Sequence, residues 1–196
     1  IPLRLVGSEM CIRDRFFLYT HQGIFDSDGR YIIVDKYPET LAMYKALMER
    51  ENYHLPILYI ADSTLDLPLC PSCIDVNIDF FATNEHNFYR RSFFYEELTP
   101  LLKPGAWIIG TYFYFENGWR SMQKLLSQYP KCSDNNFSLQ YFLKMANESG
   151  IVIDKKEICG PSIDSGNNIG FSFHQKGEKL YLLPYTAHCA LPGRMG

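Results

Sequence analysis

Short apolar runs alternate with stretches of helical spacing along the chain from residue 31 onward. Apolar runs bounded by turn signals predict buried strands, at residues 31–35, 55–62, 73–82, 106–115, 151–159 and 178–185. Apolar side chains that recur every three or four positions predict helices, at residues 37–51, 87–102, 118–130 and 137–150, with Pro100 expected to interrupt the second. This alternation predicts one α/β domain with a mostly parallel sheet and helices on both faces.

Several residues mark where these elements begin and end. Pro38 suits the first position of a helix, and Ser138 can cap the start of another. Phe137 can pack against Phe142 across that cap, and Gly150 can terminate the helix. Residues 103–105 read as a turn, and the Gly/Asn/Ser-rich stretch 160–177 has room for an extra strand at 170–174.

Two acids follow predicted strands directly, namely Asp35 and Asp62. Ligands of open parallel sheets bind beyond the carboxyl ends of the strands, so both acids are candidates for a binding site. A carboxylate such as Asp35 can accept hydrogen bonds from both hydroxyls of a ribose. Nucleotide sites of this kind have a glycine-rich turn about 20 residues before the acid. The stretch before Asp35 contains no G-x-G.

Composition narrows the class of protein. The 196 residues suffice for one substantial core, and an aromatic fraction of 15% favours a packed body over disorder. A formal net charge of −3 gives no electrostatic case for nucleic acid. No apolar run reaches the roughly 20 residues of a membrane span. The six cysteines are mostly scattered, which favours a reduced, cytoplasmic protein.

The middle of the chain resembles the class I S-adenosylmethionine-dependent methyltransferases. The resemblance rests on an acid after the third strand, an LP motif, a D-V pair leading the fourth strand and a helix that ends in LLKPG. In this chain these motifs stand at residues 61–62, 67–69, 75–76 and 101–105. Ala106 replaces the family's usual second glycine, and the pattern extends from about residue 31 to residue 115.

The resemblance implies a Rossmann-like, doubly wound sheet with an antiparallel C-terminal strand, and S-adenosylmethionine as cofactor. Asp35 would then bind the cofactor ribose. Asp62 would accept a hydrogen bond from the adenine amino group, with backbone contacts from Ala61 and Ser63. Leu65 or Leu67 could pack on the adenine, although a core position explains either leucine equally well.

Residues 4–15 resemble the translation of a transposase sequencing tag rather than any part of the family pattern. We therefore expect residues 1–15 to be a non-native arm, native sequence to start near Phe16, and the first strand with its glycine turn to be missing. The segment 3–7 is short and apolar enough to replace that strand. The alternative is a native irregular arm. We expect a single domain over 16–190 and a disordered tail at 191–196.

Candidates for chemistry follow the fourth strand. A base is needed in methyl transfer only when the acceptor carries a proton that must leave. Asp79 and His86 are the candidates for this role, with Asn84 and Glu85 beside them. A carboxylate at the end of a strand either meets the ligand or pairs with a neighbour, and an exposed loop position is the alternative for His86.

Two further features could be functional or purely structural. Tyr112 and Tyr114 could line a substrate pocket or stack in the core. Cys70 and Cys73 form a C-P-S-C motif, but zinc usually needs a second such pair, so we expect no metal. The motif lies before a strand and not at a helix start, which disfavours thioredoxin-type chemistry.

Three functions remain open. The first is methyl transfer to an acceptor of unknown class, with a small molecule favoured by the acidic balance and a cofactor site impaired by the missing turn. The second is a non-catalytic methyltransferase-like binding module. The third is an NAD-dependent oxidoreductase, whose ribose Asp35 would also suit. The LLKPG motif and an antiparallel ending argue against the third, whereas two last strands parallel to the rest would argue against the methyltransferase.

Overall fold

The structure is a computed structural model, and it describes residues 3–7, 29–50, 52, 56–61, 67–80, 82–89, 93–115, 138–163 and 179–190. The described strands are β1 (Leu3–Gly7), β2 (Arg30–Asp35), β3 (Ile57–Ala61), β4 (Ile74–Phe80), β5 (Leu102–Phe115), β6 (Ile151–Lys156), β7 (Cys159–Ile163) and β8 (Lys179–Cys189). The described helices are α2 (Pro38–Arg50), α3 (Ala82–Tyr89), α4 (Phe94–Leu98), the 3₁₀ turn η1 (Thr99–Leu101) and α6 (Leu139–Glu148).

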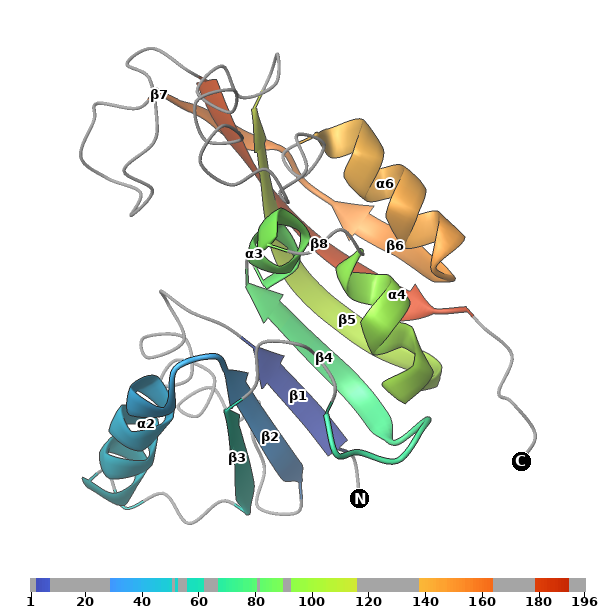
Figure 1. The fold of residues 1–196 in the computed structure, drawn as a ribbon. Helices are drawn as coiled ribbons and strands as arrows, with labels where there is room; N and C mark the ends of the chain where they lie inside the picture. Colours follow the sequence, from blue (N-terminus) through green and yellow to red (C-terminus); the bar gives the residue numbers. More distant parts are fainter. Residues whose placement is uncertain are drawn as a thin grey trace.

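The strands form one eight-stranded sheet in the order β3-β2-β1-β4-β5-β8-β6, with β7 paired to β8 (Figure 1). Strands β1 to β5 pair in parallel, whereas β8 is antiparallel to β5, β6 and β7. The predicted Rossmann-like α/β class with an antiparallel C-terminal strand is therefore confirmed. The segment Leu3–Gly7 takes the central position between β2 and β4, as its apolar character predicted.

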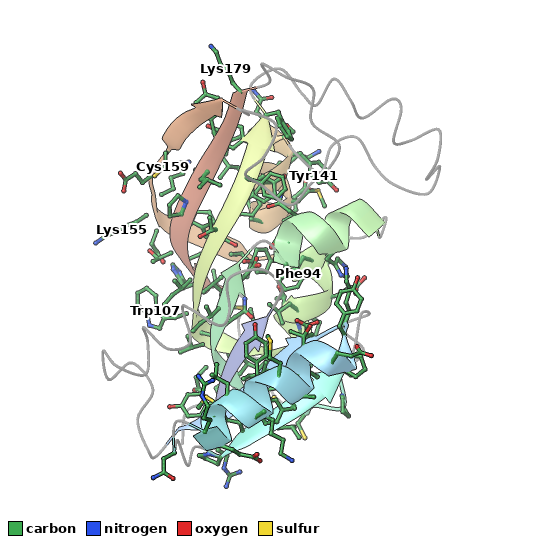
Figure 2. The ribbon with its side chains drawn as sticks, turned by 90° about the vertical axis from the view of Figure 1, so that its left-hand side faces the viewer. Phe94, Trp107, Tyr141, Lys155, Cys159 and Lys179 are labelled. Carbon is green, nitrogen blue, oxygen red and sulfur yellow. The ribbon has the colours of Figure 1, made fainter. Side chains whose placement is uncertain are left out.

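Helices pack on both faces of this sheet. Side chains alternate between the faces of β2, so Tyr31 and Ile33 pack with Leu41, Tyr44 and Met48 of α2 on one face. The other face carries the larger core, in which α4 and α6 cover β4, β5 and β8. Figure 2 shows Phe94 of α4 and the exposed Trp107 of β5 on opposite sides of the sheet. No described helix combines the length and apolar character needed to cross a membrane.

The predicted end signals of two helices are confirmed. Helix α2 begins at Pro38, and α6 follows Ser138, whose Oγ accepts a hydrogen bond from the Tyr141 N–H at 3.3 Å. Gly150 ends α6 with a φ of 77°, a conformation that glycine adopts without strain.

Other predicted boundaries were wrong. The segment 87–102 was predicted as a helix interrupted at Pro100. Pro100 does lie at the start of a new turn, η1, but the segment is also divided between α3 and α4, and α3 begins at Ala82, after β4. The predicted turn 103–105 lies within β5, where a register shift and a φ of 75° at Gly105 interrupt regular pairing. Strand β7 was not predicted, and β8 extends further than expected, to Cys189.

Some predictions fall outside the described residues. These are the helix at 118–130, the strand at 170–174, the Phe137 contact, Leu65 and the tail at 191–196. The division of the chain at residue 15 also stays a prediction.

Candidate functional site

Asp35 ends β2 at the carboxyl edge of the parallel strands. Its side chain is only 2% exposed, and its Oδ1 accepts a hydrogen bond from the Tyr37 N–H at 2.8 Å. This bond holds the carboxylate in the turn between β2 and α2. The predicted position of Asp35 at a strand end is thus confirmed.

The strand ends on either side of Asp35 line up in register. Asp35 pairs with Ala61 at the end of β3, and Val34 pairs with Gly7 at the end of β1. Gly7 in turn pairs with Asp79 of β4. The end of β1 therefore separates the two acids Asp35 and Asp79. Asp62 and Ser63, predicted to continue this edge, lie outside the described residues.

Asp79 lies in one row with Gly110 of β5 and Tyr185 of β8. A Cβ atom added to Gly110 would lie 2.3 Å from Cζ of Tyr185, so only glycine leaves room for the tyrosine ring. The ring crosses β5 over Gly110, and its hydroxyl donates to Oδ2 of Asp79 at 3.2 Å. Gly110, which has no side chain, thus permits a contact across β5 between its two neighbours, β4 and β8.

The Asp79 carboxylate is surrounded by hydroxyl groups. Tyr95 of α4 donates to its Oδ2 at 3.2 Å, and the Thr83 hydroxyl of α3 donates to the same oxygen. The Thr83 N–H donates to Oδ1 at 3.2 Å, while the Tyr95 and Tyr185 hydroxyls also contact each other. The acid, which sequence alone left as either ligand-facing or paired, is therefore paired.

Burial controls the proton affinities in this cluster. Asp79 is 1% exposed, and its loss of hydration raises the pKa of its carboxyl group, although the hydrogen bonds from Thr83, Tyr185 and Tyr95 act in the opposite direction. Burial also raises the pKa of both tyrosine hydroxyls, so these stay protonated donors. The cluster joins β4, α3, α4 and β8 at the carboxyl edge of the parallel strands.

Asn84 of α3 completes the backbone pairing of β5 beyond the end of β4. Its Nδ2 donates to the Phe113 carbonyl at 2.9 Å, and its Oδ1 accepts from the Phe113 N–H at 3.0 Å. Strand β4 ends at Phe80, which is in register with Thr111. The side-chain amide therefore takes the place of a neighbouring strand at Phe113.

His86 lies in helix α3 with an exposed fraction of 8%, so the alternative of an exposed loop histidine was wrong. The reason is that α3 begins directly after β4 and turns His86 toward α4. There its Nε2 lies 3.5 Å from Oε1 of Glu97, and its ring packs edge-on against Phe94 with centroids 5.6 Å apart.

Tyr112 and Tyr114 stack within the core. The Tyr112 ring stacks on Phe142 of α6 with centroids 4.3 Å apart, and its hydroxyl donates to the Ser138 carbonyl at 3.4 Å. Tyr114 stacks on Tyr181 of β8 at 5.3 Å. These contacts account for both residues by core packing, which was one of the two alternatives.

The cysteine motif lies at the opposite edge of the sheet, because Cys73 directly precedes β4. Both Cys70 and Cys73 are free thiols. Among the described residues, no group of three or more His, Cys, Asp or Glu side chains could hold a metal ion.

Sequence analysis did not identify four residues of the Asp79 cluster and its neighbourhood, namely Thr83, Tyr95, Gly110 and Tyr185. Thr83 had a local signal, since a hydroxyl four residues after a strand-end acid can pair with that acid. Gly110 had a weaker signal, because an isolated glycine within a strand indicates a close approach by another group. Tyr95 and Tyr185 meet Asp79 only through the tertiary fold.

Comparison with known proteins places the fold among solved methyltransferase structures. Geranyl diphosphate C-methyltransferase from Streptomyces coelicolor, solved with Mg²⁺, geranyl diphosphate and S-adenosyl-L-homocysteine, matches with a TM-score of 0.68 at 10% identity, over 96% of this chain and 73% of that chain. A putative sarcosine dimethylglycine methyltransferase from Galdieria sulphuraria matches with a TM-score of 0.67 at 14% identity, over 96% of this chain and 78% of that one.

The same fold also carries other chemistry. The [4+2]-cyclase SpnF matches with a TM-score of 0.64 at 11% identity, over 98% of this chain and 75% of that chain. No family model matches the chain, and no curated protein matches its sequence. At these identities the similarity establishes a class I methyltransferase-like fold, and activity has to be argued from the site.

Proposed function

We propose that this chain is an S-adenosylmethionine-dependent methyltransferase that binds the cofactor nucleoside at the carboxyl edge of β2 and β3. The observation that carries the proposal is the position of Asp35. Its carboxylate ends β2 beside the ends of β1 and β3. The fold as a whole matches a solved methyltransferase with a TM-score of 0.68. S-adenosylmethionine supplies an electrophilic methyl group on a sulfonium.

The nucleoside half of the cofactor is proposed to contact Asp35, Ala61, Asp62 and Ser63. Asp35 accepts hydrogen bonds from the ribose hydroxyls, and Asp62 accepts from the adenine amino group between the backbones of Ala61 and Ser63. The Tyr37 N–H already orients the Asp35 carboxylate through Oδ1.

The methionine half of the cofactor has less support. Residues 8–28 follow β1 and contain no G-x-G turn whose backbone could cradle that half. We therefore expect the chain to bind methylthioadenosine, which lacks the amino-acid group, nearly as tightly as S-adenosylmethionine. A chain with a complete glycine turn would instead bind S-adenosylmethionine much more tightly than methylthioadenosine.

Asp79 and His86, which lie at and beyond the end of β4, have proposed roles in the reaction. His86 is the candidate base for an acceptor that carries a proton, and Glu97 orients its ring from 3.5 Å. Asp79, which sequence analysis also named as catalytic, has both oxygens engaged by hydroxyl and amide donors. Its role is to position the start of α3, and with it His86, relative to β4.

The acceptor is proposed to be a small molecule. The formal net charge of −3 offers no broad attraction for nucleic acid, and two of the solved neighbours are named for small-molecule substrates. Incubation with methyl-labelled S-adenosylmethionine and separate pools of small metabolites, proteins and RNA tests this class. Label in the metabolite pool supports the proposal, and label confined to protein or RNA contradicts it.

A binding module without catalysis is the second candidate. It is favoured because both proposed reaction residues already have protein partners and because the glycine turn is absent from the sequence. The oxidoreductase alternative loses support, since β8 is antiparallel to β5.

Calorimetric titration of the full chain with S-adenosylmethionine, methylthioadenosine and NAD⁺ separates these functions. Binding of the first two with turnover supports the methyltransferase, and binding without turnover in any acceptor pool supports the module. Binding of NAD⁺ alone contradicts both.

A further inference from the structure

The loop before β4 carries two thiols at the ends of one turn. Cys70 is exposed and Cys73 is half-buried, with Pro71 and Ser72 between them. Ser72 has a φ of 52°. Proline in the second position and a positive φ in the third are typical of a type II turn. The first and fourth Cα atoms of such a turn lie within about 7 Å, which overlaps the roughly 4.4–6.8 Å spanned by a disulfide.

The rest of the fold holds this turn in place. The Ser72 N–H donates to the Pro100 carbonyl at 3.0 Å, and the Cys73 N–H donates to the Leu101 carbonyl at 2.9 Å. A serine in the left-handed region is strained, and such strain persists only where the surroundings fix the backbone. The separation of the two cysteines is therefore set by the packing of the loop against η1.

The two thiols differ in accessibility, and Cys70 influences Cys73. Burial, followed by the nearby Cys70, raises the pKa of the Cys73 thiol, while Lys103 lowers it. Cys70 is the thiol that an outside reagent reaches first. An accessible cysteine beside a resolving one is the arrangement found in reversible thiol oxidation.

We infer that Cys70 and Cys73 form a reversible dithiol–disulfide site that reacts with small disulfides such as glutathione disulfide. The Cys70 thiolate attacks one sulfur of glutathione disulfide, which forms a mixed disulfide and releases one glutathione thiolate. The Cys73 thiolate then attacks Sγ of Cys70 and releases the second glutathione. The protein loses two electrons and two protons, and glutathione disulfide is reduced to two glutathione molecules.

This site is separate from the proposed cofactor edge. Cys73 leads into the start of β4, whereas Asp79 lies near the end of the same strand (Figure 1). It also differs from thioredoxin-type catalysis, because the exposed cysteine does not begin a helix. The dithiol is thus a modification site, and its oxidation leaves the residues of the cofactor edge in place.

Mass spectrometry of the folded full chain tests the inference. The chain is equilibrated with graded mixtures of reduced and oxidised glutathione, alkylated and digested with trypsin. Residues 51–90 form one tryptic peptide that contains Cys70 and Cys73 and no other cysteine. We expect this peptide to lose two hydrogen atoms reversibly, without an added glutathione.

The variants C70S and C73S are the matched controls. Each removes one partner and is expected to retain a glutathione adduct on the remaining cysteine, with a slower reaction in C70S because Cys73 is half-buried. A wild-type peptide that stays reduced at every mixture, or that keeps a stable glutathione adduct, overturns the inference. The same equilibrium in urea must favour the disulfide less than in the folded chain, since the inference attributes the proximity to the fixed turn.

Discussion

Tyr185 of β8 donates a hydrogen bond to Asp79 of β4 although strand β5 lies between them. The contact depends on Gly110, which is in register with both residues and leaves the space that the tyrosine ring fills. It connects the antiparallel end of the sheet to the edge where parallel strands bind ligands. The row Asp79–Gly110–Tyr185 therefore links β8 to the candidate site at the end of β4.

Replacement of Gly110 by alanine tests this row. The new Cβ would lie 2.3 Å from Cζ of Tyr185 and displace the ring, so we expect a loss of about 2–4 kcal/mol in the free energy of unfolding. Urea denaturation measures the loss. In a Tyr185→Ala background the same substitution should cost much less. Equal costs in the two backgrounds would mean that the ring does not occupy this space.

The buried acid predicts a pH dependence. Burial raises the pKa of Asp79 above its ordinary value of 3.8, so its neutral form contributes stability that is fully present below about pH 3.8. That contribution is lost as the pH rises through the raised pKa. Asp79→Asn cannot ionise, so its stability relative to wild type should increase over this pH range. Urea melts at several pH values measure the difference, and a constant or falling difference would contradict the prediction.

The two hydrogen bonds between the Asn84 side chain and the Phe113 backbone predict that loss of this side chain lowers stability strongly. Asn84→Ala leaves the buried N–H and carbonyl of Phe113 without this partner, and we expect a loss of about 2–4 kcal/mol. Asn84→Asp tests separately the bond that the Asn84 amide donates. It keeps an acceptor for the N–H but places an oxygen against the carbonyl, so it should also destabilise the chain. Thermal or urea unfolding measures both, and a near-neutral Asn84→Asp would refute the two-bond geometry.

Asn77 predicts a stabilising substitution. Its side chain is 1% exposed, and among the described residues its Nδ2 has no hydrogen-bond partner. Replacement by leucine, which has a similar shape, removes a buried polar group, so we expect a gain of about 1 kcal/mol. The midpoint of urea unfolding should rise. A fall in the midpoint would contradict the prediction, because it would mean that the Asn77 amide is hydrogen-bonded in the folded chain.

The sequence predicted the helix ends that are determined by residues at the ends themselves. Pro38, Ser138 and Gly150 mark helix ends through their own backbone and side-chain chemistry, and each stands where it was expected. The short apolar segment Leu3–Gly7 also paired where a first strand belongs. The parallel order and the carboxyl-edge position of Asp35 follow from the alternation of elements.

Features that depend on tertiary contacts were missed. Helix α3 has the sequence ATNEHNFY, whose polar residues leave no regular apolar stripe. It is held by a local bond from the Thr83 N–H to Asp79 and by the bonds of Asn84 to Phe113, which lies 29 residues away. The pairing of Asp79 with Tyr185 spans 106 residues and depends on the strand register. Sequence alone named Asp79 and His86 but could not show that Tyr185 and Glu97 engage them.

The central claim is that Asp35 marks a nucleoside site, and calorimetric titration of S-adenosylmethionine into wild type, Asp35→Asn and Asp75→Asn tests it most directly. Asp75 belongs to the same sheet but pairs with Lys103 near the other edge, at 2.7 Å, so it is the matched control. Loss of charge-assisted hydrogen bonds to the ribose should weaken binding by about 10- to 100-fold in Asp35→Asn and leave Asp75→Asn unchanged. Equal affinity in wild type and Asp35→Asn, or no binding by wild type, would contradict the claim.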